Sequence, residues 1–254
     1  MPPLTNTTPK PLHAVQGKPL MPWTLEGLAR GGITKVLVNT AWLEAQIPAR
    51  FGSRLDLPSG NTVDLQYSPE GRDFGGALET AGGIVRALPR LAPVFWVAAG
   101  DVFAPQFEFA QEAMARFADS GRLAHLWLVP NPAHHPEGDF GIAADGSALA
   151  DSPRKLTFST IALYRAELFG SPHCPIEAGN PQGIRAALGP LLREAIRSGH
   201  VSAEVYEGPW TDVGTPERLA QLASQALGLE WQEWQDVADA AETGFLRDRA
   251  RWRR

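Results

Sequence analysis

The sequence predicts an α/β protein whose mostly parallel sheet is covered by helices on both faces. Between residues 19 and 130, short apolar runs such as 35–39 and 92–101 alternate with stretches of helical period. This alternation is typical of parallel strands joined by crossover helices. After residue 130 the pattern changes to a hairpin and further strands. A smaller β-rich part is therefore expected to follow the parallel sheet.

The first half supports this prediction element by element. Apolar residues that share one face predict a helix over 19–32, and Gly31-Gly32 is its stop signal. The apolar, β-branched run 35–39 follows as a strand, and residues 41–52 return to a helical period that Pro48 interrupts. The remaining expected elements are a strand at 62–69, a loop and helix over 76–91, a buried strand at 92–101, a helix at 107–119 and a strand at 123–130.

The second half is expected to be richer in strands. Residues 138–150 predict a β-hairpin, because Ala-Asp-Gly supplies a turn between two short runs. A strand at 155–165, a helix at 185–198, a strand pair or a strand and loop over 201–214, and a helix over 216–228 follow. The segment 225–254 is expected to be a helical or partly ordered tail. Its Trp231, Trp234 and arginines fit either a solvated tail or a docking segment for a partner.

Composition excludes several classes of protein. With 44% hydrophobic residues the chain can bury a core, and a net charge of −5 argues against a general nucleic-acid binder. A single cysteine excludes an internal disulfide and a cysteine-based zinc site. No apolar run reaches the length of a membrane span, and the N-terminus lacks a signal-peptide core. We therefore expect a soluble, cytoplasmic protein, a monomer or homodimer, with neither nucleic acid nor membrane as partner.

Two aspartates follow predicted strands. Asp101 comes directly after the buried strand at 92–101, and the preceding Gly100 allows a ligand to approach closely. Asp212 precedes Gly-Thr-Pro, a plausible helix start. Two carboxylates at strand ends can share one Mg²⁺ together with substrate phosphates. Taken singly, each fits a helix cap or a turn equally well.

Lys10 is the basic residue that such a site would need. Pro9 and Pro11 stiffen the backbone on both sides of it, so that its ammonium group is held at low entropic cost. A compact positive charge suits a polyphosphate. The alternative is an exposed lysine in a turn.

A glycine pair in 77–88 precedes a predicted helix, and its free N–H groups could contact a nucleotide whose base needs a polar partner such as Glu79 or Thr80. This signal is weakly specific by itself. His134 and His135 are adjacent, so they do not converge on one metal ion, and a surface or substrate-lining position is expected for both.

An ordered series of segments resembles the sugar-1-phosphate nucleotidyltransferase family. The series covers residues 1–224 and comprises PLTNTTPKPL, VNTAWLEAQI, YSPEG with LETAGG, AGD, NPAHHPEGDF, LTFSTI, PLLREAI and WTDVGTPERL. No single segment identifies the family, but the order and spacing of the whole series support the resemblance strongly. NPAHHPEGDF and LTFSTI favour the branch that acts on N-acetylmuramate 1-phosphate over guanylyl or thymidylyl relatives.

The resemblance implies a Rossmann-like sheet with a nucleotide-binding half at 1–130 and a sugar-binding half at 131–224. It implies transfer of a uridylyl group from UTP to a sugar 1-phosphate, with Mg²⁺ as cofactor. Lys10 would hold nucleotide phosphate, and Asp101 and Asp212 would bind the metal. The nucleotide would also contact Glu79, Thr80, Gly82 and Gly100, and the sugar phosphate would face Asn131, Asp139 and Ser159.

Three departures from the family pattern stand out. Ala99 replaces an asparagine and Thr160 replaces a glycine of the TFSG segment. Relatives also begin with a strand and a loop resembling L-A-A-G-x-G-x-R-M, on whose last residue Met1 falls. The first central strand is therefore expected to be absent. We expect the true protein to start upstream, with a shortened, inactive descendant as the alternative.

Two other functions remain open at this stage. One is nucleotidyl transfer to another sugar 1-phosphate of the mannose or glucose type. The other is a non-catalytic protein that binds a nucleotide sugar, because the phosphate-binding loop is missing. Retention of all three charged residues of the predicted site counts against the second alternative.

Overall fold

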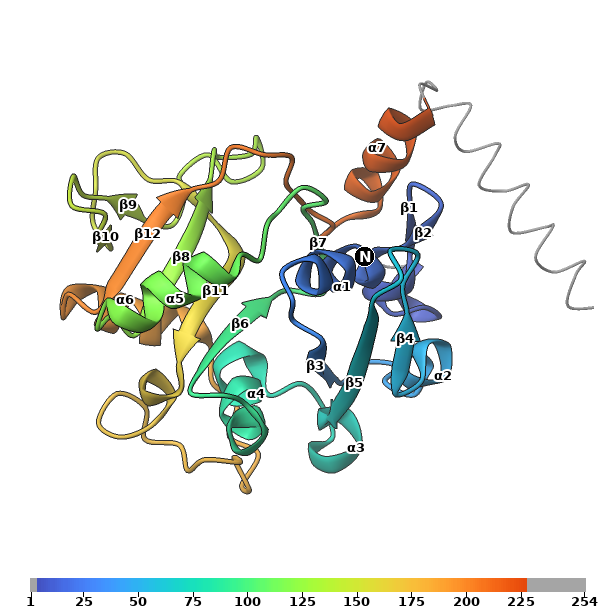
Figure 1. Cartoon of the computed structure of the whole chain (residues 1–254), viewed down its shortest axis with the longest axis horizontal. Helices are drawn as coiled ribbons and strands as arrows, with labels where there is room; N and C mark the ends of the chain where they lie inside the picture. Colours follow the sequence, from blue (N-terminus) through green and yellow to red (C-terminus); the bar gives the residue numbers. More distant parts are fainter. Residues whose placement is uncertain (1–3, 228–254) are drawn as a thin grey trace, which may run out of the picture.

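The computed structural model describes residues 4–227 of the chain. It contains two larger β-sheets that stand side by side, with helices packed around them (Figure 1). The expected α/β class is confirmed. None of the helices within residues 4–227 is long and apolar enough to cross a lipid bilayer.

The first sheet belongs to the N-terminal part of the chain. Its strand order is β3-β5-β4, with β3 at Lys35–Thr40, β5 at Thr62–Pro69 and β4 at Arg54–Asp56. Strands β3 and β5 are parallel, whereas β4 runs antiparallel to β5. The helices that connect or flank these strands are α1 (Leu20–Arg30), α2 (Gln46–Phe51) and α3 (Glu70–Phe74).

The second sheet has the order β12-β8-β11-β6. Strand β8 (Ala124–Val129) pairs in parallel with β12 (Val201–Val205). Strand β11 (Thr157–Arg165) runs antiparallel both to β8 and to β6 (Val94–Ala98). The sheets are thus mixed, because β11 enters from the C-terminal half and inserts between two strands of the N-terminal half.

Helices cover both faces of the second sheet. One face packs its side chains, among them Leu126 and Tyr164, against α4 (Glu79–Ala87) and α6 (Leu188–Arg197). The opposite face, with Trp127 and Leu163, packs against α1 and α5 (Gln111–Asp119). Neighbouring residues of one strand therefore belong to different cores, as the two-residue repeat of a strand requires.

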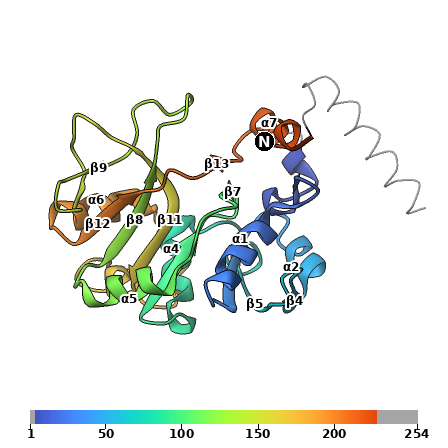
Figure 2. The ribbon, with the colours of Figure 1, turned by 45° about the horizontal axis from the view of Figure 1, so that its top comes forward.

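Three short ladders complete the fold. They are β1 (Ala14–Val15) with β2 (Lys18–Pro19), β7 (Val102–Phe103) with β13 (Thr211–Asp212), and the predicted hairpin of β9 (Gly141–Ile142) with β10 (Ala148–Leu149). Figure 2 shows β7 and β13 between the two larger sheets. Helix α7 (Pro216–Leu227) packs Leu219 and Leu222 next to Val15 and Leu20 of the N-terminal segment.

The facing edges of the two larger sheets border one cavity. Strands β3 and β6 are edge strands, and within residues 4–227 no strand pairs with their second edges. Both strands line a cavity of about 740 Å³, β3 through Val36–Thr40 and β6 through Phe95–Ala98. A strand edge carries unpaired N–H and C=O groups. Within the described part of the chain, two unpaired strand edges therefore border the cavity.

Several expected boundaries are corrected by the structure. The helix expected over 107–119 begins only at Gln111, because Phe107 and Phe109 are buried in extended chain before it. The two-residue strands β1, β2 and β7 and the short β4 and α3 were not predicted, since such lengths carry no periodicity. The predictions for Trp231, Trp234 and the arginine-rich end fall outside the described residues.

Phe107 is the aromatic anchor of the core between the two sheets. Its ring centroid lies 6.0 Å from that of Trp96 and 5.4 Å from that of Trp127. Replacement of Phe107 by alanine is expected to lower the free energy of unfolding by about 3–5 kcal/mol, because a buried phenyl group leaves a cavity. Urea denaturation followed by tryptophan fluorescence measures this change. The exposed Trp42→Ala is the control, and an equal loss in both variants would contradict the assignment.

Candidate active site

An ion pair connects the N-terminal segment with the loop that follows strand β6. Lys10 lies in a short 3₁₀ turn (Lys10–Leu12) between two prolines, and its Nζ is 2.9 Å from Oδ2 of Asp101. The two side chains remain 34% and 35% exposed. A ligand can therefore reach both charges. The structure thus brings two of the predicted site residues together, and their predicted roles toward phosphate and metal stay predictions.

The ladder between β7 and β13 brings Asp212 to the same place. Asp212 pairs with Val102, and the N–H of Val213 donates to the carbonyl oxygen of Asp101 at 2.7 Å. Two aspartates that are distant in sequence thereby occupy neighbouring positions of one ladder. The backbone pairing thereby holds the segments that carry the two aspartates side by side.

Two side chains from other segments lie against Asp212. Nη2 of Arg218, in the first turn of α7, lies 3.2 Å from Oδ2, and Nε2 of His134 lies 3.0 Å from Oδ1. The Oδ1 atom is nevertheless buried and accepts no hydrogen bond. His134 was expected at the surface or lining the substrate site, and the structure places it against this carboxylate.

The donor set fits one hard cation shared with a substrate. Among residues 4–227 no group of three or more His, Cys, Asp or Glu side chains could hold a metal by itself. Mg²⁺ is typically bound through one or two carboxylates together with substrate phosphates. Asp101 and Asp212 supply two such carboxylates, and Oδ1 of Asp212 accepts no hydrogen bond of good geometry from the described residues, although His134 lies beside it.

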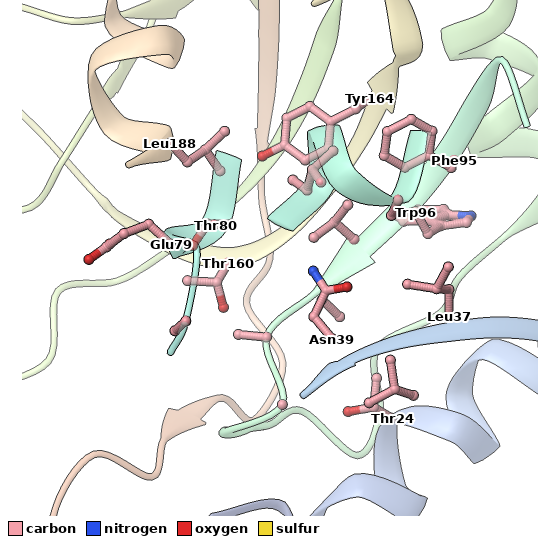
Figure 3. Close-up of a pocket in the computed structure, with 18 of the residues that line it drawn as sticks. Thr24, Leu37, Asn39, Glu79, Thr80, Phe95, Trp96, Thr160, Tyr164 and Leu188 are labelled. Atoms are coloured by element: carbon pink, nitrogen blue, oxygen red, sulfur yellow. The ribbon is translucent and has the colours of Figure 1, made fainter. Parts of the chain in front are cut away.

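The cavity between β3 and β6 extends beside this charged cluster. Pro11 and Gly100, the chain neighbours of Lys10 and Asp101, line it. A Cβ atom on Gly100 would lie only 3.3 Å from Cγ of Pro11, so a larger residue would narrow this point. Of the other predicted contact residues, Glu79, Thr80 and Asp139 also line the cavity. Figure 3 shows Glu79 and Thr80 on one wall, with Thr160 beside them.

Glu70 fixes the turn that carries Glu79 and Thr80. Its side chain is only 3% exposed, and its Oε2 accepts a hydrogen bond from the N–H of Leu78 at 2.8 Å. The next residue, Glu79, has a left-handed φ of 62°. Burial raises the pKa of Glu70, while the hydrogen bond from Leu78 and the charge of Arg86 lower it. The analysis of the sequence missed Glu70, although a carboxylate directly after strand β5 was a signal for it.

Gly82 does not line the cavity. A Cβ atom at this position would lie 2.6 Å from the carbonyl oxygen of Ile184, and the Gly82 N–H donates to the carbonyl oxygen of Ala186. Gly82 thus allows helix α4 to approach the segment 184–186 closely. Its predicted contact with the nucleotide stays a prediction.

Asn131 and Ser159 are also outside the cavity lining. The amide of Asn131 donates to the carbonyl oxygens of Pro136 and Lys155. Ser159 is fully buried and donates through Oγ to the carbonyl oxygen of Trp127 at 2.6 Å. The Asn131 amide therefore holds loop segments of the C-terminal half, and the Ser159 hydroxyl joins β11 to β8. The predicted contacts of both residues with the sugar phosphate stay predictions.

Thr160 adopts a strained backbone conformation in the cavity wall. Its φ is 62°, and the pairing of β11 with β8 shifts register between Phe158 and Ala162. Side-chain hydrogen bonds hold this bulge: Asp139 Oδ2 accepts the N–H of Phe158, and Trp210 donates to the carbonyl oxygen of Ser159. These hydrogen bonds hold Thr160 in its strained conformation, and strained residues of this kind cluster at functional sites.

Comparison with known proteins agrees with this geometry. Residues 1–157 match the family model described as nucleotidyl transferase. The chain is 42% identical over 240 residues to the N-acetylmuramate alpha-1-phosphate uridylyltransferase of Neisseria meningitidis serogroup B, covering 91% of this chain and 94% of the relative. The chain belongs to the nucleotidyl transferase family.

Further relatives extend the comparison. A Caulobacter vibrioides protein of the same name as the Neisseria enzyme is 28% identical over 235 residues, which is 89% of this chain and 90% of the relative. Among solved structures, a candidate glucose-1-phosphate thymidylyltransferase from Bacillus anthracis has a TM-score of 0.68 at 17% identity. The structural match covers 91% of this chain and 91% of the Bacillus anthracis chain, and this likeness shows the nucleotidyl transferase fold.

Replacing Thr160 by glycine is expected to raise the free energy of unfolding by about 1 kcal/mol, because glycine adopts a left-handed φ without the steric cost of a Cβ atom. Thermal denaturation of the two proteins measures the difference. Thr157→Gly, in the extended part of the same strand, is the matched control and is expected to destabilise. A loss of stability in Thr160→Gly would show that the strain is absent.

Proposed function

We propose that this chain transfers a uridylyl group from UTP to N-acetylmuramate 1-phosphate, which gives UDP-N-acetylmuramate and pyrophosphate. The observation that carries the proposal is that Lys10 contacts Asp101 and the β7–β13 ladder joins the segments of Asp101 and Asp212, while Pro11 and Gly100, the chain neighbours of Lys10 and Asp101, line the cavity. The printed activity of the two relatives that match most of the chain supports the choice of substrates.

The reaction needs charge neutralisation and alignment more than acid–base catalysis. An oxygen of the sugar phosphate attacks the α-phosphorus of UTP, the bond to the β-phosphate oxygen breaks, and pyrophosphate leaves. Asp101 and Asp212 would hold Mg²⁺, which neutralises charge on the phosphates when bound. Lys10 would hold a phosphate oxygen of the nucleotide, because its ammonium group is one-third exposed and lies 2.9 Å from the carboxylate of Asp101.

Each half of the chain is proposed to bind one of the two substrates. In this proposal residues 1–130 bind the nucleotide, with Glu79 and Thr80 next to the base, and residues 131–224 bind the sugar. Both walls of the cavity fit this division, since Glu79 comes from helix α4 and Asp139 from the C-terminal half. The product is a precursor in the recycling of peptidoglycan, and UTP as substrate places the reaction in the cytoplasm.

Substitution of either metal-binding aspartate by asparagine is expected to lower turnover at least roughly 100-fold, because one charge needed for phosphate neutralisation is lost. The assay follows pyrophosphate release from UTP, Mg²⁺ and N-acetylmuramate 1-phosphate with the wild-type chain, Asp101→Asn and Asp212→Asn. The matched control is Asp151→Asn, an exposed aspartate outside the cavity lining, which is expected to retain full activity.

The same assay separates the alternatives. Faster turnover with mannose or glucose 1-phosphate, or with another nucleoside triphosphate, would change the assigned substrates. Binding of UDP-N-acetylmuramate by calorimetry without turnover would favour a binding protein. Full activity of Asp101→Asn would remove the proposed metal site.

A further inference from the structure

The cavity is lined by one cation and three carboxylates. Among the described residues that line it, Arg193 is the basic one, and Glu70, Glu79 and Asp139 are acidic. Two of the carboxylates already accept backbone hydrogen bonds, Glu70 from Leu78 and Asp139 from Phe158. The positive charge of Arg193 is thus the exception in an otherwise acidic lining.

Arg193 has no anionic partner within residues 4–227. It comes from helix α6, whose Leu192 and Ile196 are buried in the core. Its guanidinium carbon lies 5.7 Å from the ring centroid of Phe140, and this is its one polar or aromatic contact in that part of the chain. By contrast, Arg197, one turn further along the helix, pairs with Glu194 at 3.6 Å. Arg193 therefore keeps its full capacity to bind an anion.

The backbone of α6 makes room for this side chain at the cavity end of the helix. A Cβ atom built on Gly189 would lie 3.0 Å from Nη1 of Arg193, so the guanidinium lies back over the preceding turn. Gly189 and Leu188 line the cavity as well. Arg193 is an exposed residue, and its guanidinium lies near the ring of Phe140, where the lack of a side chain at Gly189 leaves room for it at the cavity wall.

The proposed acceptor carries a group that suits this position. N-acetylmuramate differs from N-acetylglucosamine by a lactyl ether that ends in a carboxylate. A guanidinium binds a carboxylate through two parallel hydrogen bonds, and such charge-assisted bonds are stronger than neutral ones. The three carboxylates of the lining would instead repel an acidic acceptor that found no cation. A single positively charged side chain in the half that is proposed to bind the sugar would therefore offset the negative charge of an acidic sugar.

We infer that Arg193 determines the preference for an acidic acceptor by binding the carboxylate of the sugar. The inference rests on the proposed function, because it concerns the acceptor of the same reaction. Arg193 acts on the acceptor and not on UTP, since it lies on a helix of the C-terminal half with Asp139 and Phe140 beside it.

The test compares two acceptors that differ only in the lactyl group. Turnover with UTP, and binding by calorimetry, are measured for N-acetylmuramate 1-phosphate and N-acetylglucosamine 1-phosphate. The proteins are the wild-type chain, Arg193→Met, Arg193→Lys and the matched Arg197→Met. Arg193→Met is expected to lower the ratio of kcat/KM for the acidic over the neutral acceptor roughly 10- to 100-fold, with kcat/KM for the neutral acceptor unchanged. Arg193→Lys is expected to restore part of the ratio.

Each other result has a definite meaning. An unchanged ratio in Arg193→Met overturns the inference and leaves the proposed function intact. An equal fall of kcat/KM for both acceptors also overturns it, because Arg193 then serves the fold or the shared phosphate. A fall of the ratio in Arg197→Met would show a general effect of charge on α6. If the wild-type chain neither binds nor turns over either acceptor, the proposed function fails together with the inference.

Discussion

The pairing of β7 with β13 is the interaction on which the candidate site depends. This ladder has only two residues in each strand, yet it joins Asp101 and Asp212 through the backbone. It also sets where helix α7 begins, because Pro216 follows a few residues later and carries Arg218 back onto Asp212. The hydrogen bonds of a backbone ladder do not depend on the charge of the side chains, so the ladder can hold the two segments together while Lys10 and Arg218 offset the charges of the aspartates.

The two larger sheets are joined by packing and not by a common ladder. Phe107 and Trp96 occupy one core with Val63 and Leu65 of β5, so that apolar contacts span from one sheet to the other. Between the facing edges of β3 and β6 the same region is open as the cavity. The cavity therefore has room for a ligand, and the strand edges that border it lack pairing partners among the described residues. Its walls are fixed by the aromatic core on one side and by the α4–α6 packing on the other.

Much of the fold could be predicted from the sequence, whereas the roles of individual side chains could not. Elements with several turns or alternations, such as α1 and β5, follow from periodicity, and the β9–β10 hairpin follows from its Asp-Gly turn. Periodicity carries no information on β7, whose length is two residues. In the site, Lys10 and Asp101 could be singled out because a proline-flanked loop and a strand end are local features of the sequence, whereas their contact with each other could not be foreseen. The hydrogen bond of the Ser159 hydroxyl to the carbonyl oxygen of Trp127 depends on the pairing of two strands that are distant in sequence, so it could not be foreseen either.

The charges around the two aspartates have a consequence for ligand binding. In the described structure Lys10 neutralises Asp101, while Arg218 and His134 face Asp212, so the site is balanced before any substrate arrives. On the proposed function, a nucleotide enters with its own phosphate charges and a metal ion. Lys10 would then exchange the carboxylate of Asp101 for a phosphate oxygen, and Asp101 would be free to hold the metal ion. Such an exchange of partners would leave each charge with a counter-charge, which is the condition for keeping carboxylates and phosphates together in a partly buried site.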